Sequence, residues 1–220
     1  MESPLCPPRL EQPRVIETLA WDGQQCVRLD KHMARLERTC AKLGYALDVK
    51  YVLAQLQQLQ QLHVGVVLRV RVTVGNTGDV EVTNAPLAAS AHVWRLAIAS
   101  QRLQADDPWL QIKTTQRALY DQVRAALPAG LEEIIFCNER GEVCEGTITN
   151  VFFDAGQGLC TPPLLSGLLP GVLREELLAS GTCQEAVLHQ DQLPHVRLWV
   201  GNSLRGLIPA VLTALVSGTA

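Results

Sequence analysis

The sequence predicts a mixed α/β (α+β) protein of two domains, and three observations lead to this prediction. Runs with the two-residue period of strands alternate with runs at helical spacing in both halves of the chain. With 220 residues, 47% of them hydrophobic, the chain can bury one large core or two small ones. A polar stretch containing Asp106-Asp107-Pro108 separates two differently patterned halves. We therefore expect a loose Pro-rich tail (1–13), a small N-terminal α/β domain (14–99), an interdomain linker (100–108) and a larger C-terminal domain (109–220).

The first half is expected to begin with a hairpin and a helix. Residues 15–20 have the pattern of a strand, Asp22-Gly23 is a hairpin turn signal, and 26–29 would be the returning strand. Asp30 is then expected to cap a helix that ends at Gly44. The helix is indicated by apolar residues at spacings of three and four: Met33, Leu36, Cys40 and Leu43.

A Gln-rich stretch after Asp48 leaves two interpretations, a low-complexity segment or a packed helix. Its regular leucines (Leu53, Leu56, Leu59 and Leu62) favour an amphipathic helix. Periodicity alone does not choose the topology of the sheets. The remaining expected elements are strands at 64–74, 80–83 and 93–99, a helix near 115–127, strands near 131–137 and 149–153, a helix near 171–179, and a strand ending at Val200.

Bulk properties exclude several classes of partner. A net charge of −3, a pI near 6.0 and no Lys/Arg-rich run argue against nucleic acid. The first residues lack the basic start and apolar core of a secretory signal, and no apolar run approaches the roughly 18 residues of a membrane span. The seven cysteines are scattered without metal-like spacing, so we expect reduced thiols in a cytoplasmic protein, no metal site, and buried rather than catalytic roles for Cys137 and Cys144.

The stretch Glu145-Gly146-Thr147-Ile148-Thr149-Asn150 stands directly before an apolar strand. A carboxylate near such a strand costs free energy unless it is paired or hydrogen-bonded, and the protonated ring nitrogen of a pyridine cofactor would be one partner. The alternative is a strand-end carboxylate in an ordinary turn after Gly141-Glu142.

The second candidate is Lys113, one of four lysines. The other three (Lys31, Lys42 and Lys50) lie on or beside polar helix faces, whereas Lys113 stands between Leu110, Ile112 and a Thr-Thr pair. Apolar surroundings lower the pKa of an amine, as a neutral nucleophile toward an aldehyde requires. The alternative is a surface lysine whose stem covers apolar side chains.

The Glu-Gly-Thr-x-Thr-Asn motif resembles that of the fold-type IV pyridoxal-phosphate enzymes, also called class IV aminotransferases, which most often have Ser in place of Thr149. Further segments resemble family landmarks in the family's order, from about Val15 to Pro209. Within the family, the Lys-Thr-Thr and Asn-Ser-Leu-Arg-Gly versions are most similar to those of 4-amino-4-deoxychorismate lyases and of the lyase half of their fusions with the synthase. The segments are His32-Met33-Ala34-Arg35-Leu36, Lys113-Thr114-Thr115, Leu169-Pro170-Gly171-Val172-Leu173-Arg174 and Asn202-Ser203-Leu204-Arg205-Gly206.

The resemblance implies a D-amino acid aminotransferase-like fold, the cofactor pyridoxal 5′-phosphate (PLP) and a role for each matching residue. Lys113 would form the Schiff base with the cofactor and move the proton, and Glu145 would keep the pyridine nitrogen protonated. The phosphate would be bound by the amides of Val172 and Leu173, the Ser203 hydroxyl and the Arg35 guanidinium. Without the resemblance, Gly171 would be a simple turn into a helix, Ser203 a loop hydroxyl and Arg35 a solvated charge.

Four arginines are candidates for binding substrate carboxylates: Arg69, Arg71, Arg95 and Arg205. Arg69 and Arg71 lie two apart on one strand and so project from the same face, with Thr73. Arg69 stands where branched-chain transaminases have an Arg near the substrate, but the Tyr they usually carry two positions earlier is Val67 here. For Arg95 and Arg205 the common alternative is an exposed side chain that solubilises a sheet edge.

The leading functional hypothesis is a PLP-dependent 4-amino-4-deoxychorismate lyase, which forms 4-aminobenzoate and pyruvate in folate biosynthesis. The second is a class IV transaminase acting on D-amino or branched-chain amino acids, and the third is a cofactor-free binding or scaffold protein that has kept the fold. The resemblance also implies a small-molecule substrate, a homodimer with its site near the domain boundary, and a functional link to aminodeoxychorismate synthase.

Overall fold

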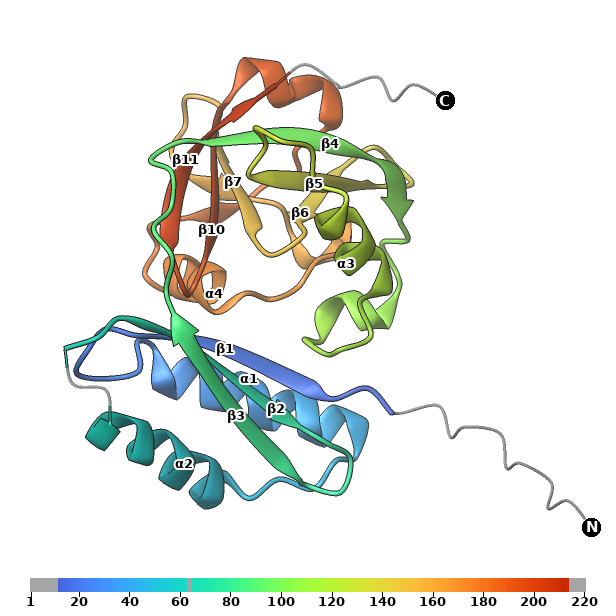
Figure 1. The fold of residues 1–220 in the computed structure, drawn as a ribbon. Helices are drawn as coiled ribbons and strands as arrows, with labels where there is room; N and C mark the ends of the chain where they lie inside the picture. Colours follow the sequence, from blue (N-terminus) through green and yellow to red (C-terminus); the bar gives the residue numbers. More distant parts are fainter. Residues whose placement is uncertain (1–11, 63–64, 214–220) are drawn as a thin grey trace, which may run out of the picture.

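A computed structural model describes residues 12–62 and 65–213, and they form two domains around two separate sheets (Figure 1). The smaller domain has an antiparallel sheet in the order β1-β2-β3. Two helices lie on one side of this sheet in Figure 1. The bounds are β1 (Val15–Trp21), α1 (Leu29–Leu43), α2 (Val49–Leu62), β2 (Leu68–Val74) and β3 (Val80–Pro86).

The alternation of β2 shows why the smaller domain folds in this way. Its residues at even positions, Leu68, Val70, Val72 and Val74, are buried in one cluster with Leu36 of α1. Arg69 and Arg71 project from the other face, as the period of two predicts. The predicted end of α1 is also confirmed, because Gly44 caps it with the left-handed φ of 69°.

The larger domain has an eight-stranded sheet in the order β10-β11-β4-β5-β6-β7-β8-β9, and an additional pairing of β10 with β7 closes part of it into a ring. Apolar side chains of six of these strands form the core, which contains Ile135, Val143, Val151 and Val200. The strands are β4 (Trp94–Leu103), β5 (Glu133–Asn138), β6 (Val143–Gly146), β7 (Asn150–Asp154), β8 (Cys160–Thr161), β9 (Gln184–Glu185), β10 (Arg197–Asn202) and β11 (Gly206–Leu212). The helices are η1 (Pro108–Gln111), α3 (Ala118–Ala125), η2 (Leu164–Ser166), α4 (Val172–Ala179) and η3 (Gln190–His195).

The domain boundary differs from the predicted one. Strand β4 belongs to the large sheet, where it pairs in parallel with β5 and β11, so the predicted linker at 100–108 and the boundary after residue 99 are wrong. The chain crosses between the sheets at 87–93, after β3 and before β4. The end of β4 was mistaken for a linker because Ser100, Gln101 and Arg102 are exposed polar residues within a strand.

The predicted returning strand at 26–29 and the predicted cap Asp30 are also wrong. Only a single bridge joins Trp21 to Cys26, and α1 already begins at Leu29 with Arg28 before it in the left-handed region (φ 58°). The Asp22 carboxylate turns the chain instead, since its Oδ1 accepts from the amides of Gln24 and Gln25 at 2.8 Å each. Strand β11 was not predicted. The predicted tail at 1–13 lies outside the described residues as far as residue 11, as does the start of the strand predicted at 64–74.

Three further findings concern the cysteines, membrane-spanning helices and metal sites. Cys137 and Cys144 are fully buried, as predicted. Among the residues with described positions, no helix is long and apolar enough to cross a membrane. Within the same ranges, no three His, Cys, Asp or Glu side chains are grouped to hold a metal ion.

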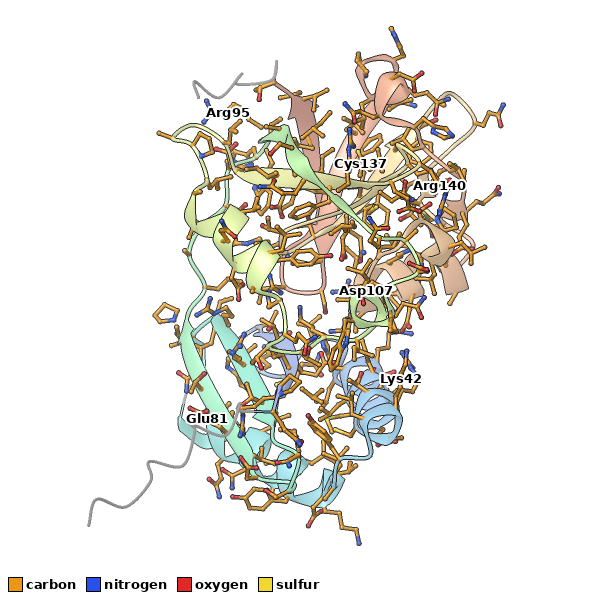
Figure 2. The ribbon with its side chains drawn as sticks, turned by 90° about the vertical axis from the view of Figure 1, so that its right-hand side faces the viewer. Lys42, Glu81, Arg95, Asp107, Cys137 and Arg140 are labelled. Carbon is orange, nitrogen blue, oxygen red and sulfur yellow. The ribbon has the colours of Figure 1, made fainter. Side chains whose placement is uncertain are left out.

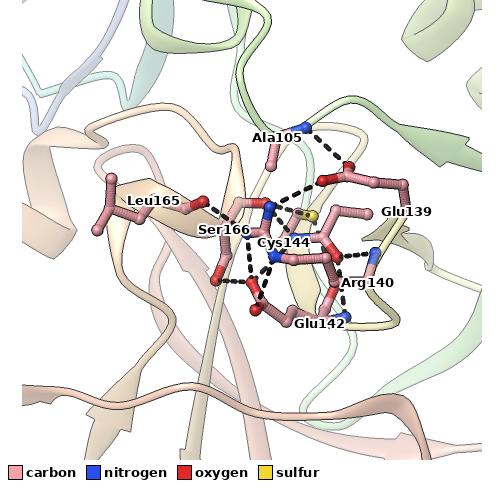
Figure 3. A network of polar contacts seen from close by, with 8 residues as sticks. Ala105, Glu139, Arg140, Glu142, Cys144, Leu165 and Ser166 are labelled. Atoms are coloured by element: carbon pink, nitrogen blue, oxygen red, sulfur yellow. Dashed lines mark hydrogen bonds and ion pairs between the residues drawn. The ribbon is translucent and has the colours of Figure 1, made fainter.

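A polar network fixes η2 to the β5–β6 hairpin (Figure 3). Arg140 Nη2 donates to the Leu165 carbonyl at 2.8 Å and to Glu142 Oε2 at 2.8 Å. The same Glu142 oxygen accepts from the Ser166 hydroxyl at 2.8 Å, and the Ser166 carbonyl accepts from Cys144 Sγ at 3.0 Å. The network thus holds 164–166 against β6, the strand that carries Glu145.

We expect Gly167→Ala to destabilise this junction more than an ordinary glycine substitution would. Gly167 has φ 85°, and an added Cβ would lie 2.7 Å from the Ala105 Cα, which is backbone and cannot move aside. The matched control is Gly156→Ala, at φ 100° with no atom within 4 Å, which carries only the left-handed cost of about 1–2 kcal/mol. Thermal unfolding should show a larger drop in Tm for Gly167→Ala, and equal drops would contradict this packing.

Candidate active site

A cavity of about 360 Å³ lies where the two domains meet. Its walls come from β1, α1 and β2 of the small domain and from the start of α3, the end of β6, the turn after it and the start of α4 of the large domain. Among the described residues, those that line a wider, open groove beside η3 and β11 include no lysine and no buried carboxylate. The groups suited to chemistry are therefore at the domain junction.

Lys113 is held at the edge of the small sheet by backbone contacts. The Ile16 amide donates to the Lys113 carbonyl at 2.8 Å, and Thr114 forms a bridge with Val15. The amine faces the cavity, and in the described part of the chain no carboxylate lies within ion-pair distance of it. Burial and the nearby charges of Arg35 and Arg117 lower the pKa of Lys113 to about 8. A substantial fraction of this amine is therefore neutral near physiological pH.

Glu145 is the last but one residue of β6, lies on another wall of the same cavity and is only 6% exposed. Its Oε1 accepts from the Tyr120 hydroxyl at 2.8 Å and its Oε2 from the Leu169 amide at 3.2 Å. Burial nevertheless raises the pKa of Glu145 to about 7, because these two hydrogen bonds and the distant charges of Lys113 and Arg117 do not compensate for it. The carboxylate can therefore take a further N–H donor.

The turn after Glu145 is shaped by a fully buried carboxylate, Glu133. Glu133 accepts from the amides of Thr147 and Ile148 at 3.0 and 3.1 Å, and from the hydroxyls of Thr147 and Thr149 at 2.5 and 3.0 Å. Gly146 is required here, since an added Cβ would lie 2.5 Å from Thr149 Oγ1. Glu133 thus explains why small hydroxyl residues follow the Glu-Gly pair.

A buried chain of polar contacts lies on the small-domain side. Arg35 binds Glu17 through Nε at 2.8 Å and Nη2 at 2.7 Å, and its Nη1 donates to the Pro170 carbonyl at 3.3 Å. His32 lies between Glu17, with Nδ1 2.6 Å from Oε2, and Ser203, with Nε2 2.7 Å from Oγ. Although burial alone would raise it, Arg35 and His32 hold the pKa of Glu17 at about 2.

The start of α4 offers unpaired backbone donors to the same cavity. The amides of Val172 and Leu173 lie in the first turn of the helix, where no intrahelical acceptor reaches them. Gly171 also lines the cavity, and an added Cβ there would lie 1.9 Å from Asn150 Oδ1. Ser203 reaches the cavity with its hydroxyl bound by His32. Three of the four residues predicted to bind the phosphate, Arg35, Val172 and Ser203, therefore line one cavity, whereas Leu173 is buried and does not line it.

The four predicted substrate arginines separate into different places. Arg69 and Arg71 line the cavity. Arg205 is half-buried and donates to the Ala88 carbonyl at 3.0 Å, so it lies beside Leu204 of the cavity wall without lining it. Arg95 is exposed, pairs with Glu132 at 3.2 Å and lies at the far end of the large domain from the junction (Figure 2). Arg95 is therefore not part of the cavity, and the prediction that it binds the substrate is wrong.

Sequence reasoning missed Glu17, Tyr120 and Arg117. A signal existed for Glu17, because a single carboxylate stands within the otherwise apolar strand Val15–Trp21 and must find partners when buried. Tyr120 and Arg117 carried no such signal. Arg117 directly precedes α3 and Tyr120 lies in its first turn, and both reach the cavity because α3 packs on β5, beside the strand that carries Glu145.

Comparisons with known proteins agree on the architecture. The sequence profile of the family described as amino-transferase class IV matches residues 14–212. A provisionally named amino-acid aminotransferase from Mesorhizobium loti has a similar structure, with a TM-score of 0.86 and 42% identity over 92% of this chain and 100% of that chain. The structure of a 4-amino-4-deoxychorismate lyase from Pseudomonas aeruginosa shares the fold, with a TM-score of 0.77 and 24% identity over 90% of this chain and 82% of that chain. A provisionally named aminodeoxychorismate lyase from Schizosaccharomyces pombe is 28% identical over 213 residues, which are 92% of this chain and 91% of that protein.

We expect the two shifted pKa values to give the cofactor-free protein a stability minimum near pH 7–8. From the ordinary value of 4.5 up to about 7, unfolded Glu145 has released its proton while folded Glu145 keeps it, so stability falls by up to about 3 kcal/mol. From about 8 up to 10.5, folded Lys113 is neutral while the unfolded amine is protonated, so stability rises again.

Thermal unfolding across this pH range tests the minimum. Glu145→Gln should remove the fall on the acid side and leave the rise on the alkaline side. A wild type and a Glu145→Gln variant that lose stability in parallel between pH 4.5 and 7 would contradict the assignment to Glu145.

Proposed function

The chain belongs to the amino-transferase class IV family, whose enzymes depend on pyridoxal 5′-phosphate, and we propose that it is a 4-amino-4-deoxychorismate lyase, forming 4-aminobenzoate and pyruvate. The observation that carries the proposal is one cavity that contains a buried amine of lowered pKa, Lys113, and a buried carboxylate of raised pKa, Glu145. The choice of the lyase is supported by the Lys-Thr-Thr and Asn-Ser-Leu-Arg-Gly sequences and by the similarity to the Schizosaccharomyces pombe protein.

The residues present fit this cofactor at three points. Lys113 presents a nucleophile to an aldehyde, and Glu145 has room for the N–H of a protonated ring nitrogen. The amides of Val172 and Leu173 suit a phosphate, together with the hydroxyl of Ser203. In our proposal Arg35 contributes positive charge to the phosphate from beside Pro170, while its ion pair with Glu17 fixes its position.

When bound, the cofactor supplies an electron sink for the carbanion that forms at the amine-bearing carbon. Lys113 Nζ is the base that takes the proton from this carbon, and its lowered pKa keeps it neutral enough to do so. The same amine then returns a proton to the departing three-carbon fragment, which leaves as pyruvate while the ring becomes aromatic. Glu145 holds the ring-nitrogen proton, and Tyr120 orients the carboxylate through its 2.8 Å hydrogen bond.

Transamination is the second candidate, and the 42% identity to the Mesorhizobium loti protein favours it. Both reactions use the same lysine and carboxylate, so the cofactor site does not distinguish them. An amino donor added without a keto acid converts the cofactor of a transaminase to its amine form, visible as a change in absorbance. A lyase does not need to convert its cofactor to the amine form. A cofactor-free scaffold is a weaker candidate, because a fold alone requires neither an unpaired Lys113 nor Glu145.

We also propose that the protein is a cytoplasmic homodimer and that aminodeoxychorismate synthase supplies its substrate. The family resemblance supports both points. The placement of the cavity at the domain junction agrees with a site near a boundary.

We expect Lys113→Ala to abolish both cofactor attachment and product formation. The assay is 4-aminobenzoate formation from chorismate and glutamine, with purified aminodeoxychorismate synthase supplying the substrate. Lys42→Ala is the control, because Lys42 is exposed on α1 and lies outside the cavity. A cofactor-loaded wild type that forms no 4-aminobenzoate would refute the lyase, and a fully active Lys113→Ala would refute the catalytic lysine.

We expect Glu145→Gln to keep the cofactor attached to Lys113 but to reduce kcat by about 100-fold or more, since the ring nitrogen loses its anionic partner. Cofactor absorbance and single-turnover rates separate attachment from chemistry. Tyr120→Phe should have a smaller effect, because it removes one hydrogen bond to Glu145 and leaves the charge. Turnover near that of the wild type in Glu145→Gln would remove Glu145 from the mechanism.

A further inference from the structure

Arg71 is a cavity-lining arginine for which the described residues offer no partner. It lies in the middle of β2, opposite Thr18 of β1 and Thr83 of β3, and Thr18 also lines the cavity. Its side chain is half-buried, yet it forms no hydrogen bond or ion pair within the described ranges. A guanidinium has five N–H donors, and a partly buried one without acceptors is unfavourable. The position therefore favours an anion from outside the chain.

Arg117 reaches the same cavity from the large domain and is held rigidly. Its Nε donates to Asp121 at 2.8 Å and its Nη2 to the Thr147 carbonyl at 2.7 Å, while its guanidinium carbon lies 5.5 Å from the centre of the Tyr120 ring. These contacts leave Nη1 without a partner in the described part of the chain. Because Asp121 is 64% exposed, it offsets little of the charge of Arg117.

The two guanidinium groups repel one another across the junction. The pKa of Arg71 is lowered by burial first, then by the charges of Arg117 and Arg69. The charge of Arg117 also lowers the pKa of Lys113. An anion between Arg71 and Arg117 would relieve this repulsion and would be held from both domains at once.

We propose that Arg71 and Arg117 bind the same carboxylate of the substrate from opposite sides of the domain junction. Arg117 is then a specificity-determining residue. The identity of the substrate rests on the function proposed above. Planar guanidinium groups match a carboxylate through paired N–H donors. The cofactor phosphate does not need these two arginines, because it has its own donors at the start of α4 and at Ser203.

The test is a double-mutant cycle on KM in the coupled 4-aminobenzoate assay. Arg71→Gln and Arg117→Gln should each raise KM about 10- to 100-fold, with cofactor affinity and absorbance unchanged. If both hold one carboxylate, the double variant should raise KM by clearly less than the product of the single effects. If the KM increases of the two single variants multiply in the double variant, the two arginines bind at separate sites. If either single variant leaves KM unchanged, that arginine does not bind the substrate. Either result overturns the proposal.

Two sets of variants separate substrate binding from folding. Arg95→Gln is the matched control, an exposed arginine outside the cavity that should leave KM unchanged. Because Arg117 also binds Asp121 and Thr147, Arg117→Lys is included. It keeps the charge and loses the planar fork, so it should bind cofactor normally and still raise KM. A normal KM for Arg117→Lys would overturn the paired geometry.

Direct binding distinguishes failure of this inference from failure of the proposed function. Calorimetry of the cofactor-loaded protein with 4-aminobenzoate and with pyruvate measures carboxylate binding without turnover. If the wild type makes no 4-aminobenzoate, the lyase is refuted, but the shared site stands when Arg71→Gln and Arg117→Gln both weaken binding of the same probe. The shared site is refuted if the variants bind both probes as tightly as the wild type does, or if the wild type binds neither probe.

Discussion

The buried ion pair of Glu17 and Arg35 is the interaction on which the rest of the site depends. It joins β1 to α1, and Arg35 extends it to the Pro170 carbonyl of the large domain. His32 extends it to the Ser203 hydroxyl. Removing one partner of such a pair leaves an uncompensated buried charge and costs several kcal/mol, about 3–5. The pair therefore connects the small domain to the large one at Pro170 and Ser203, and it fixes Arg35 beside the cavity.

Three carboxylates are buried in the described part of the chain, and their partners distinguish Glu145, which lines the cavity, from the other two. Glu17 is paired with Arg35, and Glu133 accepts from two amides and two hydroxyls of the turn at 147–149. Glu145 has only a tyrosine hydroxyl and one amide, and burial raises its pKa to about 7. The first two are satisfied by the fold itself. Glu145 is the carboxylate that the fold leaves able to bind a ligand.

Local sequence marked candidates for the site but did not decide their roles. The surroundings of Lys113 and the carboxylate before an apolar strand each had an ordinary alternative, and the family resemblance chose between them and added Arg35, Val172 and Ser203. The boundary at 87–93 was not predictable in this way, because the polar end of β4 has the composition of a linker while its backbone pairs with β5 and β11. Arg95 and Arg71 have similar sequence surroundings, yet only the tertiary arrangement places one in the cavity and the other at the far end of the domain.

The location of the cavity follows from how Lys113 is held. Its segment belongs to the large domain in sequence, but its backbone hydrogen bonds go to Ile16 of β1 and to Arg14 directly before this strand. Glu145 and the turn after it are anchored entirely within the large domain, through Glu133 and the network around Arg140. The amine and the carboxylate are therefore positioned by different domains, and their separation depends on the packing between the two. A change at β1 that leaves every cavity-lining side chain intact can still move Lys113 relative to Glu145, so the small domain takes part in the chemistry through its backbone.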